Sequence, residues 1–162
     1  MRLSKKFVFR FLFLVIILSA IVGSLSTFTI LKFQEKNSDE LVKDYYFSEN
    51  SVQVSPHHIR KGMAKGDDSF ILVDLRSEEE YLEEHIVGAV NIPAYKSRYK
   101  SAYEDVERIV NSFENLIEEN PEKDIIIYCY SIPCMTGSKI GKMLVEHDIY
   151  VQKLGIGWNE WR

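Results

Sequence analysis

The hydrophobic pattern of the chain begins with one long apolar run, residues 11–31, which contains no charged residue. As a helix rising about 1.5 Å per residue, this run is long enough to cross the hydrocarbon core of a bilayer. It has no polar stripe of the kind that a helix on the surface of a globular domain turns toward water. The pattern therefore predicts a transmembrane helix.

The charges beside this run predict its orientation. Every charged residue before position 35 is a cation, and all but Lys32 precede the run: Arg2, Lys5, Lys6 and Arg10. The positive-inside rule then places the N-terminus in the cytoplasm and the rest of the chain outside. A cleaved signal peptide, giving a secreted domain, is the alternative, but the run is long for a signal core. We predict that residues 1–33 are a retained anchor that contacts membrane lipid through residues 11–31.

The next segment, residues 34–50, is polar and charged apart from an aromatic cluster at residues 45–47. We expect a juxtamembrane linker that is partly helical, with its aromatic rings at the membrane interface or packed on the domain. The remaining residues, 51–162, are expected to form the folded domain.

Short β-prone runs alternate with helical patterns through this domain. Strands are expected at residues 51–54, 70–73, 89–92, 125–128 and 149–154. Helices are expected to start after Ser55 and at Ser77, to cover residues 103–119 and 137–147, and to form a last turn at 157–161. The sequence after Ser77 has the form of a capping box. The alternation predicts an α/β fold with a mainly parallel sheet flanked by helices.

Composition narrows the classes of function. The 162 residues are 46% hydrophobic and 27% charged, which excludes a fully disordered chain. A net charge of −4 argues against a nucleic-acid partner bound through a broad basic face. Two cysteines supply neither a disulfide framework nor four zinc ligands, and no pair of histidines has metal-ligand spacing. We therefore expect no bound metal and no cofactor.

Two of the expected strands end in ionisable or nucleophilic residues. Asp74 and Arg76 follow one strand, and Cys129 follows another. Open parallel sheets place their sites at the carboxyl ends of the strands. Cys129 also precedes a loop and a helix N-terminus, where amides and the helix dipole stabilise a thiolate. We expect Cys129 to be a nucleophile with a depressed pKa; the alternative is a small buried residue that ends a strand.

Three motifs resemble those of the rhodanese-like domain family and occur in the same order. They are ILVDLRSEEEYLEEHIVGAVNIP, then IIIYC ending at Cys129, and finally LGIGWNEW. The matching positions are Asp74, Arg76, Glu80, Tyr81, His85, Ile86, Gly88, Ala89, Asn91, Ile92, Pro93, Cys129, Leu154, Gly157 and Trp161. The resemblance covers residues 51–162 and implies about five parallel strands. It also implies sulfur transfer through a persulfide on Cys129.

The loop after Cys129 departs from the family pattern Cys-x-x-Gly-x-Arg-Ser, because it is longer and holds no arginine. The candidate residues of an anion-binding loop are Tyr130, Ser131, Ile132, Pro133, Met135 and Thr136. Lys139 is a candidate replacement for the missing charge, or else a solvated residue in a first helical turn. Related phosphatases carry Cys-x5-Arg, but here the sixth position is Met135, which cannot clamp phosphate as arginine does. We therefore do not expect phosphatase activity.

A second cysteine, Cys134, lies in the same loop. A curled loop can bring the two cysteines within disulfide range, and disulfides persist outside the cytoplasm. Cys134 is therefore a candidate resolving residue or disulfide partner, and otherwise a loop residue without a role. We expect its pKa to stay near that of an ordinary thiol. Asp74 and Arg76 are candidates for an ion pair that supports the loop.

These features favour a sulfurtransferase or persulfide carrier on the extracytoplasmic side of a membrane. Its partner is expected to be a small sulfur-containing substrate or a protein thiol. One alternative is a thiol–disulfide redox module that uses Cys129 and Cys134, and another is a non-enzymatic, anchored binding module.

Overall fold

The computed structural model describes residues 5–34 and 37–162. The chain divides into two compact units, Met1–Tyr46 and Phe47–Arg162. Arg2 of the expected basic flank and Glu35 of the expected linker lie outside the described residues.

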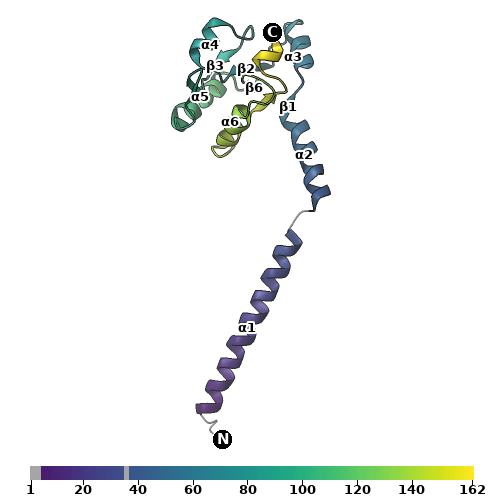
Figure 1. Cartoon of the computed structure of the whole chain (residues 1–162), viewed down its shortest axis with the longest axis vertical. Coiled ribbons are helices and arrows are strands. Elements are labelled where there is room, and N and C mark those ends of the chain that lie inside the picture. Colours follow the sequence, from purple (N-terminus) through teal and green to yellow (C-terminus); the bar gives the residue numbers. More distant parts are fainter. Residues whose placement is uncertain (1–4, 35–36) are drawn as a thin grey trace. The chain divides into compact units, whose positions relative to one another are not determined.

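The first unit is helical. Helix α1 covers Lys5–Gln34 and contains a 20-residue stretch, Phe9–Phe28, with a mean hydropathy of 2.4 and no buried residue (Figure 1). By length and composition, this helix suits either a membrane span or a signal sequence.

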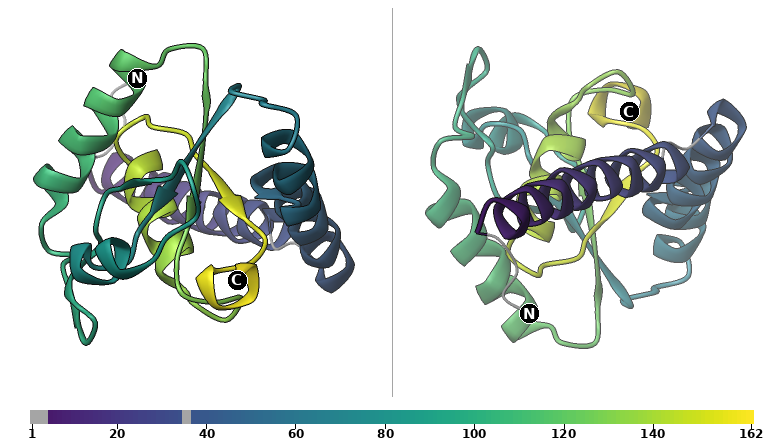
Figure 2. Two further views of the ribbon diagram at one scale, coloured as in Figure 1. Left: turned by 90° about the horizontal axis from the view of Figure 1, so that it is seen from above. Right: turned by 90° about the horizontal axis from the view of Figure 1, so that it is seen from below.

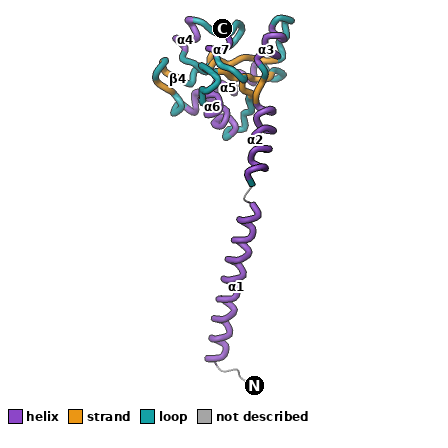
Figure 3. The backbone as a smooth tube through the Cα atoms, turned by 45° about the vertical axis from the view of Figure 1, so that its right-hand side comes forward, coloured by secondary structure: helices purple, strands orange, loops and turns teal. Residues whose placement is uncertain are grey.

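The segment expected to be a partly helical linker is mostly one helix, α2, over Ser38–Val52 (Figure 3). Its start is a reciprocal cap between Asn37 and Glu40. The Glu40 amide donates to Asn37 Oδ1 at 2.8 Å, and the Asn37 amide donates to Glu40 Oε2 at 3.2 Å. Two of the orphan amide groups of a helix start are satisfied in this way, which favours a helix over an extended linker.

The second unit is built on a five-stranded sheet in which every pairing is parallel, as the sequence predicts. The strand order is β1 (Gln53–Val54), β7 (Gln152–Leu154), β6 (Asp124–Tyr128), β2 (Phe70–Asp74) and β3 (Val90–Asn91). The two longest strands, β2 and β6, are neighbours, and their register sets Asp74 opposite Tyr128. The carboxyl ends of both strands, with Asp74 on β2 and Cys129 just after β6, therefore lie at one edge of the sheet.

Helices cover both faces of this sheet (Figure 2). Helices α5 (Val106–Glu119) and α6 (Thr136–Val145) pack on one face through buried residues that include Ile109, Phe113, Ile127, Ile140 and Leu144. Helices α3 (Pro56–Met63) and α7 (Trp158–Trp161) pack on the other through Ile59, Leu72, Ile126, Leu154 and Trp158. A short helix, α4 (Glu78–Glu83), follows β2. The architecture is the predicted α/β layering.

The structure adds a two-stranded antiparallel hairpin that the sequence analysis does not predict, formed by β4 (Tyr95–Ser97) and β5 (Lys100–Ser101). The residues of the hairpin are mostly polar or aromatic and show no apolar alternation. It occupies the region just before α5, which accordingly begins at Val106 rather than near residue 103. The final strand is also shorter than expected and begins at Gln152.

Candidate active site: a loop dithiol

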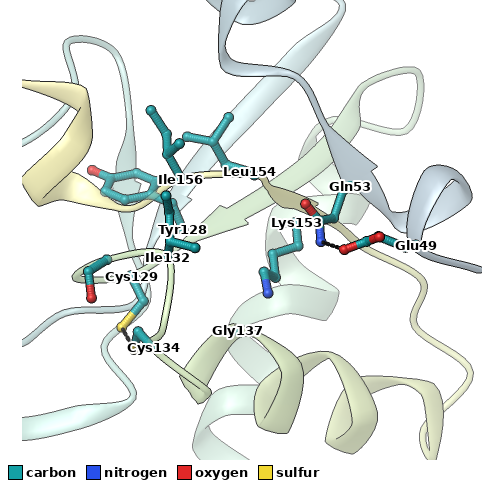
Figure 4. A pocket seen from close by; sticks show the side chains of 12 residues that line it. Glu49, Gln53, Tyr128, Cys129, Ile132, Cys134, Gly137, Lys153, Leu154 and Ile156 are labelled. Atoms are coloured by element: carbon teal, nitrogen blue, oxygen red, sulfur yellow. Dashed lines mark hydrogen bonds between the residues drawn. The ribbon is translucent and has the colours of Figure 1, made fainter. Parts of the chain in front are cut away.

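The two cysteines meet in the loop that joins β6 to α6 (Figure 4). Their Sγ atoms are 2.9 Å apart and share a hydrogen bond, and both thiols are free. Cys129 is only 5% exposed, whereas Cys134 is half-buried. A disulfide bond is about 2.05 Å long, so a small movement of either sulfur would allow the pair to close.

Helix α7 holds the loop in this shape through backbone contacts. The amides of Trp158 and Asn159 donate to the carbonyl oxygens of Cys129 and Tyr130, each at 2.8 Å. The residue before this helix, Gly157, has to be glycine because the backbone of the cysteine loop lies directly against it. A Cβ at this position would stand 2.2 Å from the Ser131 nitrogen. The C-terminal motif of the sequence is therefore a support for the cysteine loop.

Asp74 and Arg76 form the expected ion pair, with Arg76 Nη2 and Asp74 Oδ2 2.7 Å apart and both side chains buried. The Tyr128 hydroxyl also donates to Asp74 at 2.7 Å, and burial raises the pKa of Tyr128. The guanidinium of Arg76 lies 4.8 Å from the ring centroid of Trp158, whose amide binds the Cys129 carbonyl. The ion pair thus contacts the support of the loop rather than the sulfur atoms.

The environment of the two sulfur atoms separates their pKa values. The hydrogen bond with Cys129 lowers the pKa of Cys134 to about 5, helped by hydrogen bonds from the hydroxyl and amide of Thr136 and the amide of Tyr130. The same bond with Cys134 raises the pKa of Cys129, and burial and the neighbouring negative charge add to the effect. Of the two thiols, Cys134 is therefore the one that ionises more readily.

This order is the reverse of the sequence-based expectation, which gave Cys129 the depressed pKa and Cys134 an ordinary one. The reason lies at the start of α6. Met135 occupies the cap position and offers no side-chain hydrogen bond to the helix, so the Thr136 amide is directed to the sulfur of Cys134. Cys134 thus lies closer to the helix N-terminus than its mid-loop position suggests.

The candidate anion-binding residues are not equivalent in the structure. The amides of Tyr130 and Thr136 lower the pKa of Cys134, whereas the Ile132 amide donates to Glu160 Oε1 at 3.3 Å. Pro133 has no amide hydrogen. The Met135 side chain is 63% exposed, and Ser131 lines a cavity beside the dithiol. Among the candidate residues, Tyr130 and Thr136 are the two whose amides lower the pKa of Cys134.

Lys139 does not line the cavity beside the dithiol; its ammonium lies 5.1 Å from the ring centroid of Tyr103. The cation that lines the cavity is Lys153, on β7. Its side chain passes over Gly137, where a Cβ would approach Lys153 Cδ to 3.2 Å (Figure 4). The cavity has a volume of about 140 Å³. The sequence analysis misses Lys153, because its strand gives no sign that it lies opposite a helix N-terminus.

Three hydroxyl groups that the sequence analysis also misses as a cluster lie behind the dithiol. Tyr95 and Tyr103 each place their hydroxyl oxygen 2.7 Å from Thr136 Oγ1. Tyr130, in the loop, instead hydrogen-bonds the carboxylate of Glu80, which also accepts a hydrogen bond from Ser77 at 2.7 Å. The expected capping box at Ser77 is therefore replaced by a side-chain contact that anchors the loop tyrosine. Within the described ranges, no group of three or more His, Cys, Asp or Glu side chains is arranged to hold a metal ion.

A parallel α/β domain with a cysteine at the end of a central strand, in a loop leading into a helix, presents that cysteine where open parallel sheets hold their binding and catalytic sites. The chain belongs to the rhodanese-like domain family, whose family model matches residues 55–162. It is similar to the BH2092 protein of Bacillus halodurans, with 26% identity, 78% of this chain and 81% of that chain covered, and a TM-score of 0.56. A full-length Lactobacillus plantarum protein has the same fold, with 14% identity, 76% and 91% of the two chains covered, and a TM-score of 0.58.

Among curated proteins, the chain is 31% identical over 91 residues to an HTH-type transcriptional regulator of Mycobacterium tuberculosis. The match covers 56% of this chain and 34% of the regulator, so the chain corresponds to about a third of that protein.

Proposed function

We propose that this chain is a sulfur-transfer protein that works through the loop dithiol. The observation that supports the proposal most directly is the pair of sulfur atoms 2.9 Å apart, with the loop amides directed at Cys134. A half-buried thiolate beside a buried thiol of high pKa is suited to two successive steps, attack and resolution.

In the first step, the Cys134 thiolate attacks the sulfane sulfur of a donor. A bond forms between Cys134 Sγ and that sulfur, and the bond between the sulfane sulfur and the rest of the donor breaks. The bonding electrons leave with the donor remnant, which departs as a thiolate or, from thiosulfate, as sulfite. Cys134 then carries a persulfide with its negative charge near the Tyr130 and Thr136 amides.

In the second step, Cys129 attacks Cys134 Sγ and closes the disulfide. The bond between Cys134 Sγ and the outer sulfur breaks, and that sulfur leaves with the Cys129 proton as hydrogen sulfide. In this step the Cys129 sulfur is oxidised by one electron and the outer sulfur is reduced by one. Over the two steps each cysteine sulfur loses one electron, and the donor remnant and the transferred sulfur together gain two, so the electrons balance. An external thiol, small or on a protein, must then reduce the disulfide before another cycle.

This scheme also accounts for the loop without arginine. The family pattern places an arginine in the loop, where it can pair with a substrate anion. In this chain the loop has no arginine, and the amides of Tyr130 and Thr136 stabilise the negative charge of Cys134 instead. The loop therefore stabilises its own negative charge. Cys129, which the sequence resemblance assigns as the first nucleophile, becomes the resolving residue in this proposal.

We place the reaction on the extracytoplasmic side of a membrane, with α1 as the anchor. The support is the apolar stretch Phe9–Phe28 and the cations Lys5, Lys6 and Arg10 near its N-terminal end. An oxidising compartment would favour the disulfide state and make an external reductant the partner that drives turnover.

The experiment follows the full chain in detergent micelles after addition of thiosulfate or a low-molecular-weight persulfide, without reductant. The wild type should release one equivalent of sulfide and lose two hydrogens in its intact mass. Cys129→Ser should retain one added sulfur atom and release no sulfide. Cys134→Ser should load sulfur slowly or not at all. Absence of both sulfide and added sulfur with every donor would exclude sulfur transfer.

The alternative, simple thiol–disulfide exchange, is favoured by the same sulfur contact. It predicts that a low-molecular-weight disulfide oxidises the dithiol while sulfane donors do not react. The two sets of compounds, tested on one preparation, therefore separate the two functions.

A further inference from the structure

Three hydroxyl groups from separate parts of the chain meet at the dithiol. Tyr95 lies on β4, Tyr103 follows β5, and Thr136 is the first residue of α6. Each tyrosine oxygen is 2.7 Å from Thr136 Oγ1, and the two tyrosine oxygens are 3.3 Å apart. Thr136 is only 2% exposed, so bulk water does not replace these contacts.

The hydrogens of this cluster can be assigned by counting donors. Each hydroxyl carries one hydrogen and can accept two hydrogen bonds. The Thr136 hydroxyl is among the groups that lower the pKa of both cysteines, and a thiolate can only accept a hydrogen bond, so we assign the single Thr136 hydrogen to sulfur. Its oxygen must then accept from the tyrosines. When the Tyr95 and Tyr103 hydroxyls donate to Thr136, they polarise its hydroxyl. The hydrogen bond from Thr136 to the thiolate is thereby strengthened.

The groups around the cluster keep Tyr95 protonated and orient the two tyrosine rings. Burial raises the pKa of Tyr95, and the negative charge of the neighbouring cysteine adds to this effect. The ring of Tyr130, whose hydroxyl binds Glu80, packs edge-on against Tyr95 at 5.2 Å. The ammonium of Lys139 lies over the ring of Tyr103 and favours donation by that hydroxyl. Burial therefore keeps Tyr95 a donor throughout the neutral range.

We propose that Tyr95 and Tyr103 are positioning residues that act through Thr136 to hold the negative charge of the Cys129–Cys134 dithiol. The inference deepens the proposed function, because it assigns the hairpin β4–β5 and the residue after it a part in activating the thiolate. It rests on the geometry of the sulfur pair and not on the identity of the sulfur donor.

The test measures how alkylation of Cys134 by iodoacetamide depends on pH, in the full chain in detergent micelles, by peptide mass. Tyr103→Phe and Thr136→Val should each move the midpoint of this dependence to higher pH. Because only the thiolate reacts, alkylation at low pH should become about tenfold slower for every pH unit by which the midpoint rises. Tyr95→Phe should move the midpoint in the same direction. Thr136→Ser keeps the hydroxyl and should restore the wild-type midpoint.

The matched control is Tyr99→Phe, since Tyr99 is 93% exposed in the hairpin turn and contacts none of these hydroxyls. A midpoint that is unchanged in both Tyr103→Phe and Thr136→Val would overturn the proposal. If Thr136→Val fails to fold, Tyr103→Phe decides alone. Sulfide release is measured on the same proteins: a raised midpoint without sulfide release in the wild type would refute sulfur transfer and leave this inference standing.

Discussion

The guanidinium of Arg76 lies 4.8 Å above the ring centroid of Trp158, while its Nη2 pairs with Asp74 at 2.7 Å. The Trp158 amide in turn holds the Cys129 carbonyl oxygen at 2.8 Å. The strand end at β2 is therefore connected to the reactive loop through one aromatic residue of α7. Both charged side chains of the pair are almost completely buried, so neither tolerates the loss of the other.

Arg76→Gln should consequently destabilise the domain by about 3–5 kcal/mol, because it leaves the Asp74 carboxylate buried without its cation. Arg76→Lys should lie between this variant and the wild type, since lysine keeps the charge but loses the paired geometry and the stacking on Trp158. Urea denaturation measures both effects. Arg108→Gln is the control, because Arg108 is exposed. Equal stability of Arg76→Gln and Arg108→Gln would contradict the role of the pair.

Gly157→Ala should displace the cysteine loop. The new Cβ would stand 2.2 Å from the Ser131 nitrogen and 2.4 Å from the Tyr130 carbonyl carbon, so backbone must move. Gly141→Ala is the matched control: nothing lies within 4 Å of its new Cβ, and alanine in a helix gains about 1 kcal/mol over glycine. The readouts are the melting temperature and the rate at which a mild oxidant closes the disulfide. Closure at the wild-type rate in Gly157→Ala would show that α7 does not shape the loop.

The sequence predicts the sheet and the position of the reactive loop well, for a physical reason. The segments Phe70–Asp74 and Asp124–Tyr128 are short and strongly apolar, and each apolar run is closed by a residue with a polar group, Asp74 or Tyr128. Such runs are buried on both faces of a parallel sheet, and parallel strands bring their carboxyl ends together. The contact between the two cysteines follows from their position in one tight loop.

The sequence pattern does not predict the cluster of the Tyr95, Tyr103 and Thr136 hydroxyls. It also does not predict which of the two cysteines has the lower pKa. Tyr95 and Tyr103 are separated from Thr136 by 41 and 33 positions, and they meet it only because an unpredicted hairpin folds back over α6. The pKa order depends on which sulfur the Thr136 amide approaches, which a spacing of five residues does not determine. These are properties of three-dimensional packing rather than of periodicity.

Removing either cysteine should change the pKa of the other in opposite directions. Cys129→Ser removes the thiol whose hydrogen bond most lowers the pKa of Cys134, so this pKa should rise from about 5. Cys134→Ser removes the main cause of the raised pKa of Cys129, which should fall. The pH dependence of alkylation in the two variants measures both changes. Changes of the same sign in the two variants would show that the hydrogen bond between the thiols does not set the order of their pKa values.

The pH dependence of stability should also change in Cys134→Ser. In the wild type, Cys134 is ionised in the folded chain above about pH 5, whereas an unfolded thiol ionises near about pH 8.5. Between these values the unfolded state binds the additional proton, so the free energy of unfolding should rise with pH. This contribution is complete above the unfolded pKa and is lost as the pH falls through the folded one. Urea denaturation across this window should give a shallower rise for Cys134→Ser; an unchanged slope would contradict the lowered pKa.

Lys153→Gln should weaken the use of anionic sulfur donors. The Lys153 side chain lines the cavity that the two cysteines share, and the loop supplies no arginine. The KM for thiosulfate should rise while that for an uncharged sulfane donor stays constant, because only the anion loses an electrostatic partner. Lys142→Gln is the control, since Lys142 is exposed and lies 3.8 Å from Glu146. An equal increase of KM for both donors would point to a change of cavity shape instead of charge.

The orientation of the chain in a membrane can be tested through the dithiol itself. The charges before position 35 are all positive, and all but Lys32 lie on the N-terminal side of the apolar run, which favours a cytoplasmic N-terminus. A thiol reagent that does not cross membranes should then label Cys134 in intact cells after gentle reduction, since this thiol is half-buried and carries the lowered pKa. Cys134→Ser should lose most of this labelling. Labelling that requires lysis would place the domain in the cytoplasm, where a reducing pool keeps the pair as thiols, and the disulfide step would then need a dedicated oxidising partner.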